Sequence, residues 1–330
     1  MLSAPVWFHR KARAVHGIAA VYEERHPQTM PLTRTNKKVY VFVAGSAVFF
    51  GTMEVALKLA GGDFDPFQIT FLRFLIGGFF LLPFAIIEYR GQPKGFMTGR
   101  LWLSMLILGV VNLPFCMILF QFSIMYLNAA TAAVIFCSNP IFTMLFAHVM
   151  TKDDKINRNK MIALALGLVG LVFMIRPWDI QEGNTLQGAL FSFSAAVIFG
   201  FYGVLGGKTI NRVGVLTQTT SSFFFGSLVL LFMLPVLGRP ILAGATDNIA
   251  LVLYISIVVT GGGYLLYFLA MKYSNATTAS ITFFLKPVIA PIFAVIILGE
   301  AITYNMYIGI ALILAASYMM SFRKQRQTPT

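Results

Sequence analysis

The sequence predicts an all-α integral membrane protein of ten transmembrane helices, arranged as two inverted five-helix repeats. Hydrophobic residues make up 58% of the 330 positions and charged residues only 11%, with a mean hydropathy of +0.78. So few polar residues could not cover a soluble globule of this size. Ten apolar stretches follow one another, and a segment of the first half recurs in the second.

The apolar stretches have the length of membrane-spanning helices. Most contain about 20 residues, which at helical rise crosses a hydrocarbon core of ~30 Å. Transmembrane strands would be about half as long and would alternate apolar with polar residues, which these do not. We expect a first repeat over 39–178 and a second over 187–322. The ten spans are Val39 to Ala60, Pro66 to Glu88, Leu101 to Phe122, Ala129 to Met150, Met161 to Trp178, Gln187 to Gly207, Thr217 to Leu237, Ile249 to Met271, Ala276 to Leu298 and Tyr304 to Phe322.

The repeat is visible in one ungapped alignment. Tyr126 to Ala147 matches Tyr273 to Ala294 at nine of 22 positions. Ala47 to Gly51 similarly matches Ala196 to Gly200. A duplicated half is the simplest cause.

The charge distribution predicts the topology. The net charge is +13, and with a cytoplasmic N-terminus 20 of the 25 Lys and Arg residues lie inside, whereas only Arg176 and Arg239 lie outside. This asymmetry follows the positive-inside rule, so both termini are expected in the cytoplasm and the basicity does not indicate nucleic acid binding. Five spans per half is an odd number, so the second half enters the membrane inverted, as in transporters that work by alternating access.

The two termini are expected to be basic cytoplasmic tails, residues 1–38 and 323–330. The first has no hydrophobic region typical of a signal peptide. Translation from Met30 is an alternative that would leave a short basic lead. We expect no cofactor or metal: three of the four histidines lie in the first tail, and GVLGGKT at Gly203 to Thr209 is one residue short of a phosphate-binding loop.

Apart from Glu88 and Arg176 near the ends of their spans, four charged residues fall inside the spans: Glu54, Lys58, Arg73 and Lys286. A charge near the bilayer centre costs at least ~2.5 kcal/mol, so each needs a partner or a function. We expect Glu54 and Lys286 to face a cavity, with Glu54 exchanging a proton and Lys286 meeting an anionic substrate group. Alternatively, Glu54 pairs with Lys58 or Lys286 and only holds helices together. Arg73 is the third candidate for substrate binding or coupling. Anchoring at a helix or membrane interface is the alternative for Arg73 and for Lys58.

Helix-breaking residues at equivalent places in the two halves indicate where a cavity forms. Pro140 aligns with Pro287, and Pro114 aligns with Gly261, which Gly262 and Gly263 follow. Close packing of small residues is the alternative explanation. The candidates for lining the path are the polar or aromatic neighbours Asn112, Gln121, Asn139, Tyr264 and Tyr267.

The first two spans contain the stretch FFGTMEVALKLAGGDFDPFQITFLRF, and later segments contain NPIF and KPVIAPIFAVIILGE. In these segments the chain resembles the drug/metabolite transporter superfamily, specifically its EamA-type ten-helix members. The resemblance covers nearly everything from Val39 to Phe322. It departs from the family at Phe50, where Trp is frequent, and at Lys286, where Glu is frequent. It implies an export carrier of the bacterial inner membrane, with a cavity between the halves.

Together these observations predict an exporter of small metabolites or drugs that works by alternating access, either secondary-active with proton coupling through Glu54 or facilitative. The small-molecule substrate, protons and the lipid bilayer are its expected partners, and a monomer is favoured. The alternative is a non-transporting membrane scaffold or sensor subunit, although the chain has no soluble signalling domain. A membrane enzyme is not supported, because neither a metal cluster nor a buried nucleophile with a base is present in the sequence.

Overall fold

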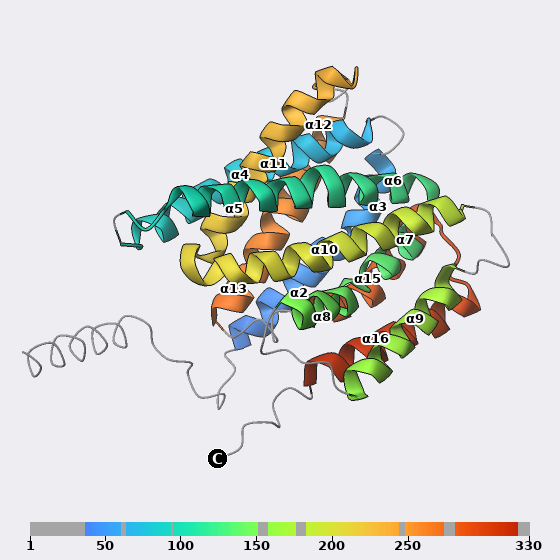
Figure 1. The fold of residues 1–330 in the computed structure, drawn as a ribbon. Coiled ribbons are helices and arrows are strands. Elements are labelled where there is room, and N and C mark those ends of the chain that lie inside the picture. Colours follow the sequence, from blue (N-terminus) through green and yellow to red (C-terminus); the bar gives the residue numbers. More distant parts are fainter. Residues whose placement is uncertain are drawn as a thin grey trace, which may run out of the picture. The chain divides into compact units, whose positions relative to one another are not determined.

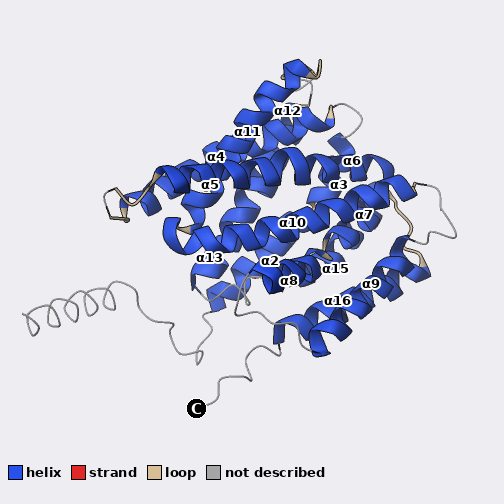
Figure 2. Cartoon of the chain, viewed as in Figure 1, coloured by secondary structure: helices blue, strands red, loops and turns tan. Residues whose placement is uncertain are grey.

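The computed structural model describes residues 37–60, 64–93, 95–150, 158–175, 183–243, 248–273 and 281–322. Both expected tails therefore lie outside the described residues, apart from 37 and 38. Within the described ranges the chain is helical, with short turns and no strand (Figure 2). The protein is an all-α membrane protein, as the sequence predicts.

The first half occupies the five expected spans in order. Several spans consist of more than one helical element, because the helix is interrupted or changes to the wider π-helical form. The elements are α2 (Lys37–Gly51), α3 (Met53–Ala60), α4 (Pro66–Arg90), α5 (Gly99–Val110), the π-helix η1 (Val111–Met117), α6 (Ile118–Tyr126), α7 (Ala129–Phe136), α8 (Asn139–Met150) and α9 (Arg158–Ile175).

The second half follows the same order. Its elements are α10 (Leu186–Val213), α11 (Val215–Val236), α12 (Ile249–Leu253), the π-helix η2 (Tyr254–Gly262), α13 (Gly263–Tyr273), α15 (Ile281–Leu298) and α16 (Tyr304–Phe322). Helix α10 extends past the apolar stretch that ends at Gly207. It ends at Gly214, whose φ of +90° lies in the left-handed region that favours glycine.

Seven of the described helical segments are long and apolar enough to cross a membrane: Lys38–Ala60, Pro66–Arg90, Gly99–Tyr126, Ala129–Met150, Leu186–Gly206, Val215–Val236 and Ile249–Ala270. The other three expected spans correspond to α9, α15 and α16, which contain or adjoin residues outside the description. Their crossing of the membrane stays a prediction.

Local capping explains where several helices begin. The Asp65 side chain accepts a hydrogen bond of 2.9 Å from the Phe67 N–H, and Pro66 occupies the first helical position of α4, where a missing N–H has no consequence. Thr98 caps α5 and Thr185 caps α10 in the same way. These caps satisfy backbone groups that lipid could not satisfy.

Helices at equivalent positions of the two halves pack against each other. Helix α4 packs on α11, α7 on α15 and, most extensively, α9 on α16. Figure 1 shows α9 and α16 side by side at one edge, where they also contact α7 and α15. The central helices thus come from both halves of the chain.

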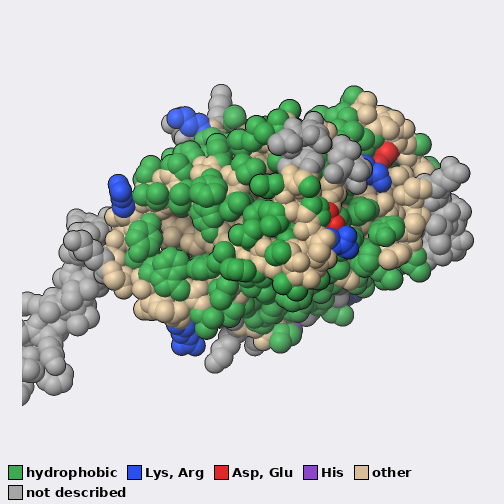
Figure 3. All heavy atoms as spheres, turned by 90° about the horizontal axis from the view of Figure 1, so that it is seen from above, with side chains coloured by type: hydrophobic (Ala, Val, Ile, Leu, Met, Phe, Trp, Pro, Cys, Tyr) green, Lys and Arg blue, Asp and Glu red, His purple; other side chains and the backbone are tan. Residues whose placement is uncertain are grey.

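The exterior is largely hydrophobic. Large apolar side chains such as Val41, Ile87, Phe232 and Ile296 are 67%, 72%, 68% and 72% exposed. On the face in Figure 3, hydrophobic side chains cover much of the surface, and the few charged ones occur singly or as adjacent pairs of opposite sign. Such a surface is stable against lipid tails rather than water, as expected of a multi-pass membrane protein.

Candidate functional site

Four spans are irregular beside one cavity. The first span turns at Thr52 between α2 and α3, and the fourth turns at Cys137 and Ser138 between α7 and α8. The third and eighth contain the π-helices η1 and η2. Each irregularity adjoins a residue that lines the cavity: Met53, Phe136, Met117 and Thr260.

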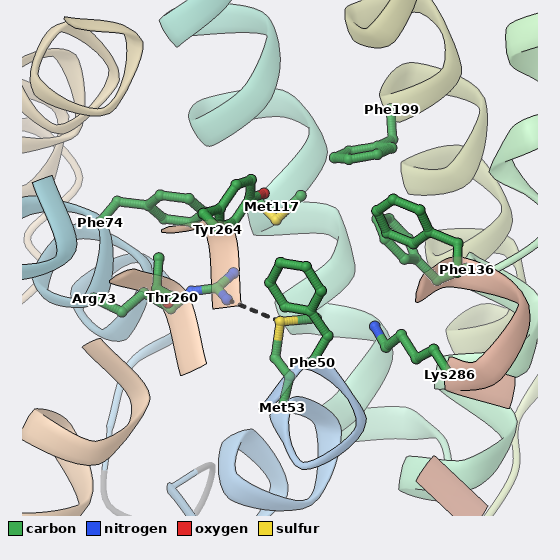
Figure 4. Close-up of a pocket in the computed structure, with 11 residues that line it drawn as sticks. Phe50, Met53, Arg73, Phe74, Met117, Phe136, Phe199, Thr260, Tyr264 and Lys286 are labelled. Carbon is green, nitrogen blue, oxygen red and sulfur yellow. Dashed lines mark hydrogen bonds between the residues drawn. The ribbon is translucent and has the colours of Figure 1, made fainter. Parts of the chain in front are cut away.

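The cavity has aromatic walls with two cations among them (Figure 4). The cavity volume open to a water-sized molecule is about 20 Å³, which is room for about one water. A larger ligand therefore requires the walls to move apart. The aromatic lining is Phe50, Phe74, Phe136, Phe199, Tyr264 and Phe283, and the rest is Met53, Met117, Thr260, Arg73 and Lys286.

Glu54 and Lys286 form an ion pair beside the cavity. Lys286 Nζ lies 2.5 Å from Glu54 Oε1, and the two side chains are 1% and 0% exposed. Glu54 comes from α3 in the first half and Lys286 from α15 in the second. The ammonium also lies 5.5 Å and 5.9 Å from the ring centroids of Phe136 and Phe120. The two opposite charges of this buried pair compensate each other in the apolar interior, and the pair links the two halves.

Arg73 has a different environment, although it lines the same cavity. It is 1% exposed, and its Nη1 lies 3.6 Å from the sulfur of Met53, which is a weak acceptor. Its guanidinium carbon lies 4.6 Å from the centroid of the Phe74 ring. Nε and Nη2 have no hydrogen-bond partner among the described residues. The guanidinium is therefore buried, and it forms no ion pair with a carboxylate of the described residues.

Of the five predicted lining residues, Tyr264 lines the cavity and the other four are not among its walls. Asn112, Gln121 and Asn139 are buried, and Asn139 Nδ2 donates to Phe136 O at 2.9 Å. The Tyr267 ring packs 5.5 Å from that of Phe283. A role of these four side chains in the transport path stays a prediction.

The predicted helix-weakening positions lie at or beside the irregular segments. Pro114 is inside η1, and Gly261 and Gly262 end η2. Gly263 begins α13, and its missing side chain leaves room for the Phe50 ring, to which an added Cβ would come within 2.7 Å. Only the backbone of Pro140 and Pro287 is described: Pro140 follows the turn before α8, whereas α15 continues through Pro287. Their role as hinges stays a prediction.

Two features of the site were not anticipated. The aromatic walls could not be recognised among 32 Phe residues, although Phe136 and Phe283 are identical partners in the repeat and both line the cavity. Lys58 neither pairs with Glu54 nor extends freely. Its Nζ donates to Ile124 O at 3.1 Å and Leu127 O at 2.7 Å, the carbonyls at the end of α6, where a cation is favourable.

Comparison with known proteins agrees with this architecture. The family model described as "EamA-like transporter family" matches residues 37–176 and again 186–322. An uncharacterized transporter of Clostridium kluyveri is 37% identical over 288 residues, covering 85% of this chain and 92% of that protein. An S-adenosylmethionine uptake transporter of Rickettsia prowazekii is 24% identical and covers 83% and 88%. A crystal structure of 18% identity shares the fold, with a TM-score of 0.60 and coverage of 87% and 97%. The chain thus belongs to the EamA-like transporter family and is a multi-pass membrane transporter.

Proposed function

We propose that this transporter is secondary-active and moves small organic metabolites or drugs by alternating access, with Glu54 as the site that couples transport to protons. The observation that carries the proposal is the buried Glu54 and Lys286 ion pair, because it joins the two halves at the cavity wall. Packing between equivalent helices of the halves supports inverted repeats that exchange conformations.

The ion pair has the properties of a conformational switch. While Glu54 is ionised, its attraction to Lys286 holds α3 against α15. A proton on Glu54 removes that attraction and leaves the ammonium of Lys286 uncompensated in an apolar wall, which costs several kcal/mol. The conformation in which water reaches this wall is then favoured. Proton binding thereby biases the equilibrium through its differential effect on the two conformations.

Polar links between the halves support closure at the end expected to face outside. Glu300 accepts hydrogen bonds from Ala129 N and Ala130 N at 2.7 and 3.2 Å. Arg239 pairs with Asp65 at 3.1 Å. The Gln68 amide donates to Ala243 O at 2.8 Å. Opening toward the outside would have to break these links.

The first prediction concerns Glu54→Gln in proteoliposomes. The variant keeps the shape of the side chain but cannot ionise. We expect it to retain counterflow exchange at equal pH and to lose most of the stimulation by a pH gradient. Uptake with an undiminished response to the gradient would eliminate Glu54 as the proton site.

Two further variants, Lys286→Met and the double variant Glu54→Gln/Lys286→Met, distinguish a role of the ion pair in proton coupling from a role in stability alone. Lys286→Met leaves a carboxylate buried alone and should lower thermal stability strongly, whereas the double variant removes both charges and should recover it. If the pair only holds helices together, the double variant would also recover gradient-driven transport. We expect it to recover stability alone.

Export is the direction that we propose, in line with the resemblance to export carriers. We place the protein in a bacterial inner membrane, with both termini on the cytoplasmic side. The relative from Rickettsia prowazekii is named for uptake, so membership of the family does not decide the direction. Transport into inside-out compared with right-side-out vesicles tests it directly. If no compound of a broad panel moves or binds, the scaffold alternative gains support.

A further inference from the structure

We propose that the cavity binds an organic monocarboxylate, whose carboxylate docks on Arg73 and whose apolar, preferably aromatic, body lies between the Phe and Tyr side chains. The inference deepens the proposed function by naming a substrate class. It rests on Arg73 and on the cavity walls rather than on the transport cycle.

The guanidinium of Arg73 forms no ion pair within the described residues, although Glu54 is near enough to attract it. The nearby carboxylate of Glu54 is engaged by Lys286 at 2.5 Å, and none of the ion pairs in the described part of the chain includes Arg73. An uncompensated charge buried in an apolar interior costs several kcal/mol. A side chain that only anchored helices would not need to accept this cost, since a polar or apolar residue could fill the same space.

The unpartnered atoms have the geometry that a carboxylate requires. Nε and Nη2 of Arg73 are both without partners among the described residues, and they lie on one edge of the planar guanidinium. Two parallel N–H donors on one edge match the two oxygens of a carboxylate in a bidentate pair. In Figure 4 the guanidinium lies amid Phe50, Met53, Thr260 and Tyr264.

The charge of the walls favours one negative charge on the ligand. Lys286 and Glu54 neutralise each other, so Arg73 contributes a net charge of +1 within the described walls. A carboxylate balances it, whereas a phosphate monoester carries about −1.5 to −2 at neutral pH and overcompensates. The α-ammonium of an amino acid would find no free carboxylate among the described lining residues. The site therefore favours simple carboxylic acids over amino acids.

The other walls select the rest of the ligand. Six of the eleven lining residues are aromatic, and Met53 and Met117 add polarisable, adaptable surface. Aromatic rings prefer stacked or edge-on contacts with other rings. The free volume among these walls is about 20 Å³, so binding requires the walls to separate, and a one-ring acid requires less separation than a large ligand.

The second prediction is tested with four probes on the purified full-length protein: 3-phenylpropionate, its amide, phenylalanine and phenyl phosphate. We expect 3-phenylpropionate to raise the melting temperature and to drive counterflow, and the other three to act at least about 10-fold more weakly. Losing a charge-assisted hydrogen bond typically changes affinity by about 10- to 100-fold.

Arg73→Met and Arg73→Lys test whether Arg73 binds the carboxylate. Arg90→Met, at the exposed end of the same helix, is the matched control. Arg73→Met should abolish the effects of 3-phenylpropionate and raise the melting temperature of the ligand-free protein, because it removes an uncompensated charge. Arg73→Lys should bind about 10-fold more weakly, and Arg90→Met should behave as wild type. If Arg73 only holds helices together, Arg73→Met should instead lower the melting temperature of the ligand-free protein.

The outcomes separate this inference from the proposed function. Transport of neutral or cationic probes with no effect of 3-phenylpropionate would overturn the monocarboxylate assignment and leave the transporter function intact. Unchanged binding in Arg73→Met would overturn the role of Arg73. Binding of 3-phenylpropionate that depends on Arg73, without counterflow, would support the site and count against alternating access.

Discussion

At the scale of single residues, Pro140 and Asn139 show how this chain tolerates a helix break within the membrane. Proline has no N–H, so Phe136 O loses the donor that residue 140 would otherwise supply to it. Asn139 Nδ2 donates to this carbonyl at 2.9 Å. Thr143 Oγ1 donates to Asn139 O, one helical turn earlier, at 3.0 Å. The Asn139 side chain thereby replaces a backbone hydrogen bond that lipid could not supply.

The third prediction follows from that exchange of donors. Asn139→Leu leaves Phe136 O unsatisfied in a buried place and should destabilise the protein by about 1–3 kcal/mol, measured by thermal unfolding in detergent. In a Pro140→Ala background the backbone can supply the donor again, so the same substitution should cost much less. Equal costs in the two backgrounds would show that the Asn139 amide does not compensate for the proline.

At the scale of elements, close approach of helices depends on glycines in contacting faces. Gly109 of α5 meets Gly226 of α11, and an added Cβ at Gly109 would lie 2.6 Å from Ser222 O and 2.7 Å from Gly226 N. Both contacts are with backbone, which cannot move aside as a flexible side chain can. Helix α11 also packs on α4, which carries Arg73, so this contact supports the cavity wall indirectly.

The fourth prediction compares two glycines of one helix. Gly109→Ala should lower stability by about 1–3 kcal/mol, because it forces α5 and α11 apart. Gly99→Ala is the matched control, since nothing lies within 4 Å of its added Cβ, and it should be neutral or slightly stabilising. Thermal unfolding of both variants measures the difference. A Gly109→Ala variant as stable as Gly99→Ala would contradict the close helix contact.

At the scale of the whole molecule, two carboxylates connect the halves at opposite ends of the helical body. Glu300 of the second half accepts from the first N–H groups of α7, and Glu88 of the first half accepts from Thr217 N and Oγ1 at 2.7 and 3.0 Å. A carboxylate at a helix N-terminus also interacts favourably with the helix dipole. Each link holds one half against the other and resists their separation.

The fifth prediction uses the two links as controls for each other. Glu300→Ala should accelerate hydrogen exchange at Ala129 and Ala130 by about 2- to 30-fold, the consequence of losing ~0.5–2 kcal/mol of capping, and leave Thr217 unchanged. Glu88→Ala should have the reverse pattern. Exchange that rises at both ends in either variant would indicate general loosening of the fold rather than two separate links.

Much of the architecture was predictable because the bilayer restricts what a chain can do. Apolar stretches of about 20 residues had to become helices, so the order of the spans followed from Val39 to Phe322. The same cost of burying charge identified Glu54, Arg73 and Lys286 as residues that need partners. The duplication and the charge asymmetry predicted inverted halves, and the family model matches the chain twice.

Other features depended on distances between residues far apart in the sequence. The sequence left Glu54 free to pair with Lys58 or Lys286, and packing of α3 against α15 brought it to Lys286, while the end of α6 held Lys58. The aromatic walls were hidden for the same reason, since lipid-facing and cavity-facing Phe are chemically identical. By itself, the sequence determined the solvent, the helices and the charges that need explanation. Only the tertiary structure decided which charge is paired and which stays open to a ligand, because pairing depends on side-chain geometry across helices.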